Sequence, residues 1–346
     1  MEWLKRLFYT LALFAAWSVL AYFYVDYTLD SPPRKEAVQL EIEPGTSGAD
    51  IGRLLKEKHL IRYDWFFNTY LFTTGNRNLQ AGVYEVSPEM DINDMLEMFS
   101  KGRQNTYTVT IPEGFTINQI SDAVAKNGNV SKEEFLKAVD EGEYDYDFLQ
   151  NIPPNENRRH KLEGYLFPST YNIPKTANAE DIVNLMLGQF ANQMEKMGAP
   201  GQLQKRNLTV DEWVTFASIV EREGQAKSEF AKIAGVIENR LQQNMRLQVD
   251  ATIQYALGEQ KERLYYKDLK LDSPYNTYKI EGLPPGPIAS PGERALTATL
   301  EPDQHTYLYY VTKKDGTGEH YFAETYQQHQ QYIEQSKKTQ TQNSSQ

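Results

Sequence analysis

The sequence predicts an α+β protein in which an N-terminal transmembrane helix precedes small α+β modules and a larger mixed α+β domain. Residues 7–24 carry no charge over eighteen consecutive positions, which is near the lower limit for crossing the hydrocarbon core of a bilayer. Residues 38–55 and 107–124 both read as a strand, a Pro/Gly turn and an amphipathic helix. Beyond them, helical patterns alternate with Pro- and Gly-rich loops, and two short strands come near the end.

The composition excludes several classes of function. A chain of 346 residues is long enough for two or three domains with substantial cores. Its formal net charge of −11 and the lack of any Lys/Arg block argue against a nucleic-acid groove. It contains no cysteine, which rules out disulfides, thiolate nucleophiles and thiolate metal sites. Its five histidines are scattered and no glycine-rich phosphate loop occurs, so the residues indicate neither a metal site nor nucleotide chemistry.

The apolar N-terminal stretch has an orientation signal. Lys5 and Arg6 precede it and Asp26 follows it, so the positive-inside rule leaves residues 1–6 in the cytoplasm. A cleaved signal peptide is the alternative, but no convincing small-x-small cleavage site precedes Asp26, and an uncleaved single-pass anchor is favoured. With either interpretation the chain after the linker at 25–37 lies outside the cytoplasm.

The next part of the chain contains a weak internal repeat. The module at 38–102 adds a strand near 82–86 and a helix near 92–99, and a second small module covers about 107–140. Two α+β modules in tandem are the simplest interpretation. Such modules bind extended polymers or serve as scaffolding, and the sequence leaves both roles open.

Residues 209–224, TVDEWVTFASIVEREG, predict the helix around which the larger domain is organised. Thr209 followed by Glu212 is a capping-box pattern, and Gly224 suits the left-handed position just past a helix end. At about 100° per residue the helix has an apolar arc of Trp213, Phe216, Ala217, Ile219 and Val220 and an opposite polar arc of Thr215, Ser218 and Arg222.

Glu223 falls inside the apolar arc, on the last turn of this helix. Apolar burial and the negative end of the helix dipole both raise the pKa of a carboxyl group. A raised pKa is what a general acid working near neutral pH needs. Glu221 lies at the edge of the arc and diverges from Glu223. The alternative is a frayed last turn in which Glu223 simply reaches solvent.

A long irregular loop follows at 273–291, with five prolines and the run Tyr275-Asn276-Thr277-Tyr278. Long ordered loops of this kind are often functional. Before it, Gln248 lies in an extended segment and Asp250 is expected to cap a short helix that ends at Gly258. After it come strands at 307–312 and 320–323, and the polar residues 336–346 are expected to be disordered.

A desolvated glutamate, a loop rich in aromatic and amide groups and an extracytoplasmic location suggest glycan cleavage. Ordinary glycosidases place two carboxylates across the scissile bond, and here the partner is not obvious. A lone acid fits a reaction in which the substrate supplies its own nucleophile. Peptidoglycan permits this, because the C6 hydroxyl of muramic acid can attack C1 and displace the neighbouring sugar without water.

Four segments together resemble the MltG-type (YceG-like) endolytic murein transglycosylases. In chain order they are LEGYLFPSTY at 162–171, ASIVEREG at 217–224, ENRLQQNMRLQVDATIQYALG at 238–258 and SPYNTYKIEGLPPGPIASPG at 273–292. The resemblance spans nearly the whole chain. It implies a LysM-like module over 38–102, a catalytic YceG-like domain over 103–335, and no metal or organic cofactor.

The resemblance also implies roles for individual residues. The family's catalytic acid is the second Glu of the I-[IV]-E-x-E motif, which is Glu223 here, and Gly224 stands where the family usually has Thr. Glu221 and Glu163, which lie within two of the shared motifs, are assigned supporting roles. Substrate-binding roles are carried onto Gln248, Asp250, Tyr275, Asn276, Thr277 and Tyr278.

The activity implied is internal cleavage of nascent glycan strands between N-acetylmuramic acid and N-acetylglucosamine, leaving 1,6-anhydromuramyl ends. The implied partners are peptidoglycan strands, membrane lipid around the anchor, and peptidoglycan synthases of the elongation machinery. Two other interpretations stay open at this point. One is a muramidase that hydrolyses the same bond with water, and the other is a non-catalytic scaffold that binds the cell wall through the repeated modules.

Overall fold

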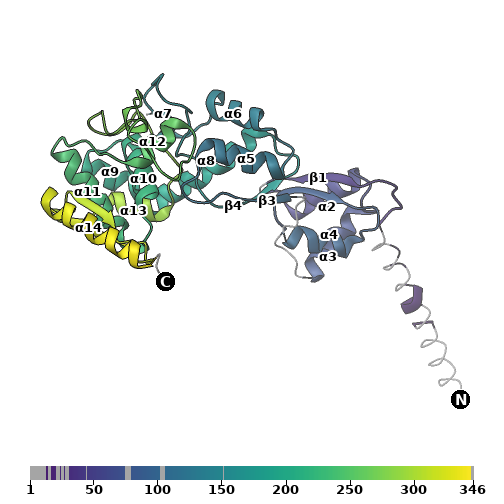
Figure 1. The fold of residues 1–346 in the computed structure, drawn as a ribbon. Helices are drawn as coiled ribbons and strands as arrows, with labels where there is room; N and C mark the ends of the chain where they lie inside the picture. The colour runs from purple at the N-terminus through teal and green to yellow at the C-terminus, as the bar shows by residue number, and fades with distance from the viewer. Residues whose placement is uncertain are drawn as a thin grey trace, which may run out of the picture. The chain divides into compact units, whose positions relative to one another are not determined.

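The structure is a computed structural model that describes residues 31–343 except 44, 75–78, 102–105 and 151, together with 13–14, 17–20, 24 and 27 (Figure 1). Most of the predicted anchor at 7–24 lies outside the described residues. Within the described part, no helix combines the length and the apolar character needed to cross a membrane. The chain divides into two compact units, the first made of residues 1–107 with 174–176 and the second of 108–173 with 177–346.

Between residues 31 and 107, the described part of the first unit has a two-stranded antiparallel sheet, β1–β2, and helices α2, α3 and α4. In the sheet Leu40 lies opposite Tyr84, and Val38 opposite Val86. The elements are β1 (Val38–Ile42), α2 (Gly48–Glu57), α3 (Asp64–Thr74), β2 (Gly82–Val86) and α4 (Ile92–Lys101). The two strands and helices α2 and α4 agree with the pattern predicted over 38–102, whereas α3 was not predicted. The LysM-like assignment stays a prediction.

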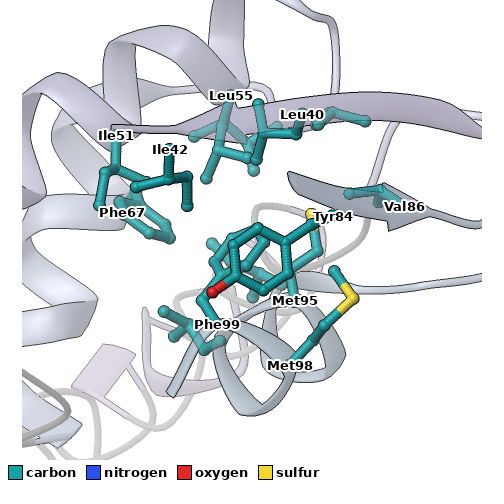
Figure 2. Packing of buried hydrophobic residues seen from close by; sticks show 14 of the residues in the cluster. Leu40, Ile42, Ile51, Leu55, Phe67, Tyr84, Val86, Met95, Met98 and Phe99 are labelled. Atoms are coloured by element: carbon teal, nitrogen blue, oxygen red, sulfur yellow. The ribbon is translucent and has the colours of Figure 1, made fainter. Parts of the chain in front are cut away.

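The core of this unit follows from the alternation of β1. Leu40 and Ile42 are buried, whereas Gln39 and Glu41 are exposed, as expected of a strand with one covered face. Figure 2 shows Leu40 and Ile42 pointing toward apolar side chains of α2 and α3. On the other strand, the Tyr84 ring meets the Phe99 ring edge-on, with centroids 4.9 Å apart.

The remaining elements are mainly helical. Residues 107–140 hold β3 and the α5–α6 pair, and β3 pairs with β4 rather than with a strand of its own module, so that the Thr110 and Thr170 hydroxyls lie 3.1 Å apart. The strands are β3 (Thr106–Thr110) with β4 (Thr170–Pro174) and β5 (Tyr309–Thr312) with β6 (His320–Ala323). The helices are α5 (Ile117–Asn127), α6 (Lys132–Glu141), α7 (Asp147–Gln150), α8 (Ala179–Lys196), α9 (Ala199–Arg206), α10 (Val210–Glu223), η1 (Lys227–Glu229), α11 (Phe230–Gln242), α12 (Asp250–Leu257), η2 (Asp268–Lys270), α13 (Glu293–Leu300) and α14 (Tyr326–Asn343).

Helix α10 is the central helix of the second unit and packs against α11, α12 and α13 (Figure 1). Its start is as predicted, because the Thr209 hydroxyl accepts from the Glu212 amide at 3.1 Å and the Glu212 carboxylate accepts from the Thr209 amide at 2.9 Å. The predicted polar arc is wrong. Thr215 and Ser218 are buried, since the loop before α13 covers that face and the Ile288 amide donates to the Ser218 hydroxyl at 3.0 Å.

The end of α10 also differs from the prediction. Gly224 is not left-handed but extended, with φ −75° and ψ 117°, and its amide donates to the Val220 carbonyl at 2.9 Å. A Cβ at this position would lie 2.6 Å from the Phe230 ring. Glycine is therefore required here for space and not for backbone conformation.

Two further predictions are wrong in detail. Val249 is the N-cap of α12 and Asp250 is its first residue, with no side-chain cap, so the Asp250 carboxylate is available for other contacts. The chain after residue 336 is not disordered as far as residue 343, because α14 continues to Asn343. Ser336 is buried and donates to the Thr312 carbonyl at 2.7 Å, which fixes this polar helix to β5.

Candidate active site

Glu223 meets a partner that comes from a distant part of the chain. Tyr310, on β5, donates its hydroxyl to Oε2 of Glu223 at 2.8 Å across a sequence separation of 87 residues. Both residues are half-buried, so the pair lies at the edge of the core with access to the surface. The last turn of α10 is thus not frayed, and its carboxylate is held in one place.

The surroundings raise the pKa of the Glu223 carboxyl above its ordinary value. Burial is the largest cause, and the negative charge of Asp250 acts in the same direction. The hydrogen bond from Tyr310 opposes them, as do the charges of His320 and Arg222. Burial also raises the pKa of the Tyr310 hydroxyl, which therefore stays a proton donor at neutral pH. A raised pKa is the property that a carboxyl needs to act as a general acid.

A second hydroxyl–carboxylate pair neighbours the first. Tyr278 donates its hydroxyl to Oδ1 of Asp250 at 2.6 Å. The charge of Glu223 contributes to raising the pKa of the Tyr278 hydroxyl, and Asp250 acts on Glu223, so the two pairs belong to one site. Asp250 and Gln248 are exposed and Tyr278 is half-buried. Three of the six residues predicted to bind substrate are therefore open to the surface, and two of them, Asp250 and Tyr278, act electrostatically on or with Glu223.

The other three residues are in the interior and shape the loop. The Asn276 amide donates to the carbonyls of Leu269 and Leu271 at 3.0 and 2.7 Å. The Gln248 amide donates to the Thr277 carbonyl at 3.1 Å, and the Val249 amide donates to the Thr277 hydroxyl at 3.0 Å. These bonds hold Gln248 in a left-handed conformation with φ 52°.

The ring of Tyr275 lies against that of Tyr255, with centroids 4.9 Å apart. Tyr275, Asn276 and Thr277 are all buried, so direct contact with a substrate is not a role that their position supports.

The two carboxylates given supporting roles hold other elements in place. Glu221 accepts from the Gly292 amide at 3.0 Å, which ties the end of α10 to the start of α13. Glu163 is completely buried and accepts from the Ile117 amide at 2.9 Å and from the Tyr255 hydroxyl at 3.0 Å. Burial raises the pKa of Glu163 to about 7.

No group of three or more His, Cys, Asp or Glu side chains in the described part of the chain is arranged to hold a metal ion.

The sequence model of the YceG-like family matches residues 40–335, which include every candidate site residue. This chain belongs to the YceG-like family. It is similar to the endolytic murein transglycosylase of Bacillus subtilis (strain 168), at 36% identity over 305 residues that cover 85% of this chain and 83% of the relative. It is similar to the endolytic murein transglycosylase of Streptococcus pneumoniae serotype 2 at 32% identity, covering 93% of this chain and 63% of that relative. A crystal structure of a YceG-like protein from Listeria monocytogenes matches with a TM-score of 0.59 and 36% identity, covering 86% of this chain and 99% of that one.

In this YceG-like chain, Tyr310 is the site residue that sequence reasoning missed. The strand around it was predicted, but nothing local indicates which element the strand faces. Its position depends on His320 of β6, whose ring lies edge-on to that of Tyr310 with centroids 5.5 Å apart. His320 is fixed in turn by Glu229, which accepts from its ring Nδ1 at 2.9 Å and from its amide at 3.0 Å. Because Glu229 follows α10 closely in the chain, this contact brings the hairpin to the end of α10. A run of tyrosines in a terminal strand, YLYYVT, is the one signal that pointed to it.

Proposed function

We propose that this protein is an endolytic lytic transglycosylase that cleaves the β-1,4 bond between N-acetylmuramic acid and N-acetylglucosamine within peptidoglycan strands. The observation that carries the proposal is a half-buried Glu223 with a raised pKa and a hydroxyl donor, Tyr310, on its Oε2. Membership of the YceG-like family and the activity named for two relatives support it.

In the proposed reaction Glu223 acts first as an acid and then as a base. Its protonated carboxyl gives a proton to the glycosidic oxygen, and the bond from C1 of the muramic acid to that oxygen breaks. The C6 hydroxyl of the same sugar forms a new bond to C1, and the Glu223 carboxylate removes the hydroxyl proton. The products are a 1,6-anhydromuramyl end and a free N-acetylglucosamine 4-hydroxyl, and no water is consumed.

Tyr310 stabilises the carboxylate formed after the first step, because its hydrogen bond is stronger to the ionised group. Asp250 is not used as a nucleophile in this scheme. Its Oδ1 is already occupied by the Tyr278 hydroxyl. We assign Asp250, Tyr278 and Gln248 to binding of sugar hydroxyl and acetamido groups, since Asp250 and Tyr278 belong to the site of Glu223 and Gln248 is the exposed residue two positions before Asp250.

The proposal includes a single-pass anchor at residues 7–24, with the N-terminus in the cytoplasm and the site outside. The uncharged stretch, the preceding bases and the following acids support this orientation. An enzyme held at the membrane surface meets strands as they are synthesised, so internal cleavage there terminates their elongation and places the enzyme beside peptidoglycan synthases.

The test compares wild type with Glu223→Gln on purified glycan strands, with products identified by mass spectrometry. We expect anhydro-ended muropeptides from wild type and none from the variant, at unchanged melting temperature. Glu262→Gln, which alters an exposed carboxylate, is the matched control and keeps full activity. Undiminished anhydro product from Glu223→Gln contradicts the assignment. Reducing muramic ends from wild type, heavier by one water, indicate hydrolysis, and strand binding without cleavage indicates a scaffold.

A further inference from the structure

A second cleft, of about 440 Å³, lies between α5 and α12. Its volume is in the range of small-ligand sites, about 300–1,000 Å³. It adjoins the proposed catalytic site at two points of the chain, because Arg222 precedes Glu223 on α10 and Ala251 follows Asp250 on α12, and both line the cleft. The proposed mechanism assigns this cleft no role.

The acidic side chains that line this cleft are already neutralised. Asp122 is paired with Lys132 at 2.6 Å. Glu259 is paired with Lys261 at 3.4 Å. Neither carboxylate therefore competes for a further cation, and neither offers an uncompensated negative charge to a ligand.

Two guanidinium groups in the cleft have only neutral partners. Arg222 donates to the Gly114 carbonyl at 3.2 Å and to the Gln260 side-chain oxygen at 3.1 Å. Arg159 donates to two backbone carbonyls at the end of α12, at 2.8 and 3.0 Å. Among the residues that the structure describes, neither arginine forms an ion pair with a carboxylate. The charged side chains that line the cleft are Lys132, Arg159 and Arg222 against Asp122 and Glu259, which leaves one excess positive charge in a chain of formal net charge −11.

The walls of the cleft are held at a fixed separation. Glu163, beneath it, accepts from the Ile117 amide at the start of α5 and from the Tyr255 hydroxyl on α12. Its complete burial means that solvent does not compete for these bonds. The recess is consequently preformed and does not depend on a ligand for its shape.

We propose that this cleft binds the peptide stem of peptidoglycan through the carboxylates of that peptide, an inference that rests on the function proposed above. The stem is attached to C3 of the same muramic acid whose C1 is attacked, so it leaves the sugar close to Glu223. A stem of three residues extends about 10 Å, and two residues that line the cleft, Arg222 and Ala251, are the chain neighbours of Glu223 and Asp250.

The chemistry of the lining matches such a peptide. Arginine binds carboxylates with two parallel hydrogen bonds, and Arg222 and Arg159 supply the two cations. Asn118 and Gln119 on α5 also line the cleft. The Gln119 Oε1 accepts from the Thr116 amide at 2.9 Å and the Asn118 Nδ2 lies 3.2 Å from the His160 ring, and the other atom of each side-chain amide suits the amide groups of a peptide backbone. A neutral sugar does not require two unpaired guanidinium groups, so the charge favours the stem over a further glycan subsite.

Direct binding is the first test, and it uses the full-length Glu223→Gln protein so that no turnover occurs. The probe is a synthetic L-Ala-γ-D-Glu-L-Lys peptide, and its fully amidated counterpart is the control, both measured by titration calorimetry. We expect the acidic peptide to bind at least tenfold more tightly than the amidated one. Adding Arg222→Gln should remove this preference, and adding Arg222→Lys should restore part of it. Equal binding of the two peptides, or a preference that survives Arg222→Gln, overturns the proposal.

Catalysis gives a second readout, in which kcat/KM is measured on peptide-bearing strands and on strands stripped of peptides by an amidase. We expect wild type to prefer the peptide-bearing strands and Asn118→Ala to reduce that preference through KM. If wild type cleaves both kinds of strand with the same kcat/KM, the stem site is overturned and the proposed function is unaffected. If the proposed function is wrong, the result is different: Glu223→Gln still releases anhydro product, whatever the outcome of the peptide titration.

Discussion

Removing the Tyr310 hydroxyl should change the pH dependence of the enzyme in a predictable direction. Tyr310→Phe keeps the ring beside His320 and deletes only the donor that meets Oε2 of Glu223 at 2.8 Å. That donor favours the ionised carboxylate and opposes the effects of burial and Asp250. Without it the pKa of Glu223 rises further, and the protonated form that acts as the acid persists to higher pH.

The size of the effect follows from the strength of the bond. A hydrogen bond to a charged group contributes about 1.5–3 kcal/mol. Tyr310 also donates, more weakly, to the protonated carboxyl, so only the difference between the two states matters. Since about 1.4 kcal/mol corresponds to one pH unit, we expect the alkaline limb of kcat/KM to move upward by about one unit.

The assay is the pH profile of kcat/KM for release of anhydro-ended product, because this parameter reports the ionisation of the free enzyme. Tyr309→Phe is the matched control. It is the neighbouring residue of β5, and its ring stacks on His329, 5.3 Å away, and not on the site. We expect its profile to match wild type. A Tyr310→Phe profile that superimposes on wild type, or moves to lower pH, would refute the role given to this hydrogen bond.

Three further outcomes concern stability and can be measured by urea denaturation. The folded pKa of Glu163 is about 7 against an ordinary 4.5, so between these values the folded state keeps a proton that the unfolded state has lost. The free energy of unfolding should fall with rising pH across this window, by at most about 3 kcal/mol. Glu163→Gln should flatten this pH dependence. An unchanged slope in Glu163→Gln would contradict the role given to the Glu163 proton. Gly224→Ala should lower the free energy of unfolding by about 1–3 kcal/mol, because the added methyl meets the ring of Phe230. Combining it with Phe230→Leu should recover part of this loss. Full stability of Gly224→Ala alone would show that the Phe230 ring moves aside without cost. Asp211→Asn should cost about 3–5 kcal/mol, because both its oxygens accept from buried Arg158 at 2.6 Å, while the exposed-pair control Glu293→Gln should cost less than about 1 kcal/mol.

Features that depend on one or two turns of chain could be predicted from the sequence. The capping box of Thr209 and Glu212 needs only local spacing and agrees with the structure. The last turn at Glu223 was also predicted from spacing, and α10 does end at Glu223. The two C-terminal strands were also predicted, because alternation and the Asp315-Gly316 turn are local signals.

Features that depend on what covers a surface could not be predicted in this way. Helical spacing places Thr215 and Ser218 opposite the apolar side chains, but only the folded loop shows that this face is covered as well. Gly224 has an ordinary backbone conformation, and the reason for glycine lies in the ring of Phe230. Tyr310 required the most distant information, since the contact that positions its hairpin joins Glu229 to His320, 91 residues apart.

The distance along the chain between Glu223 and Tyr310 has a consequence for how the proposed enzyme matures. During synthesis the N-terminal part emerges first, so α10 is present while β5, which carries Tyr310 87 residues after Glu223, is still missing. Until the hairpin packs against α10, the Glu223 carboxyl lacks two hairpin groups that affect its pKa, the Tyr310 hydroxyl and His320. On the proposed function, Glu223 therefore gains its Tyr310 donor only after the C-terminal hairpin has folded against the end of α10. Proteolytic removal of the hairpin formed by β5 and β6 would take away this donor while leaving Glu223 in place.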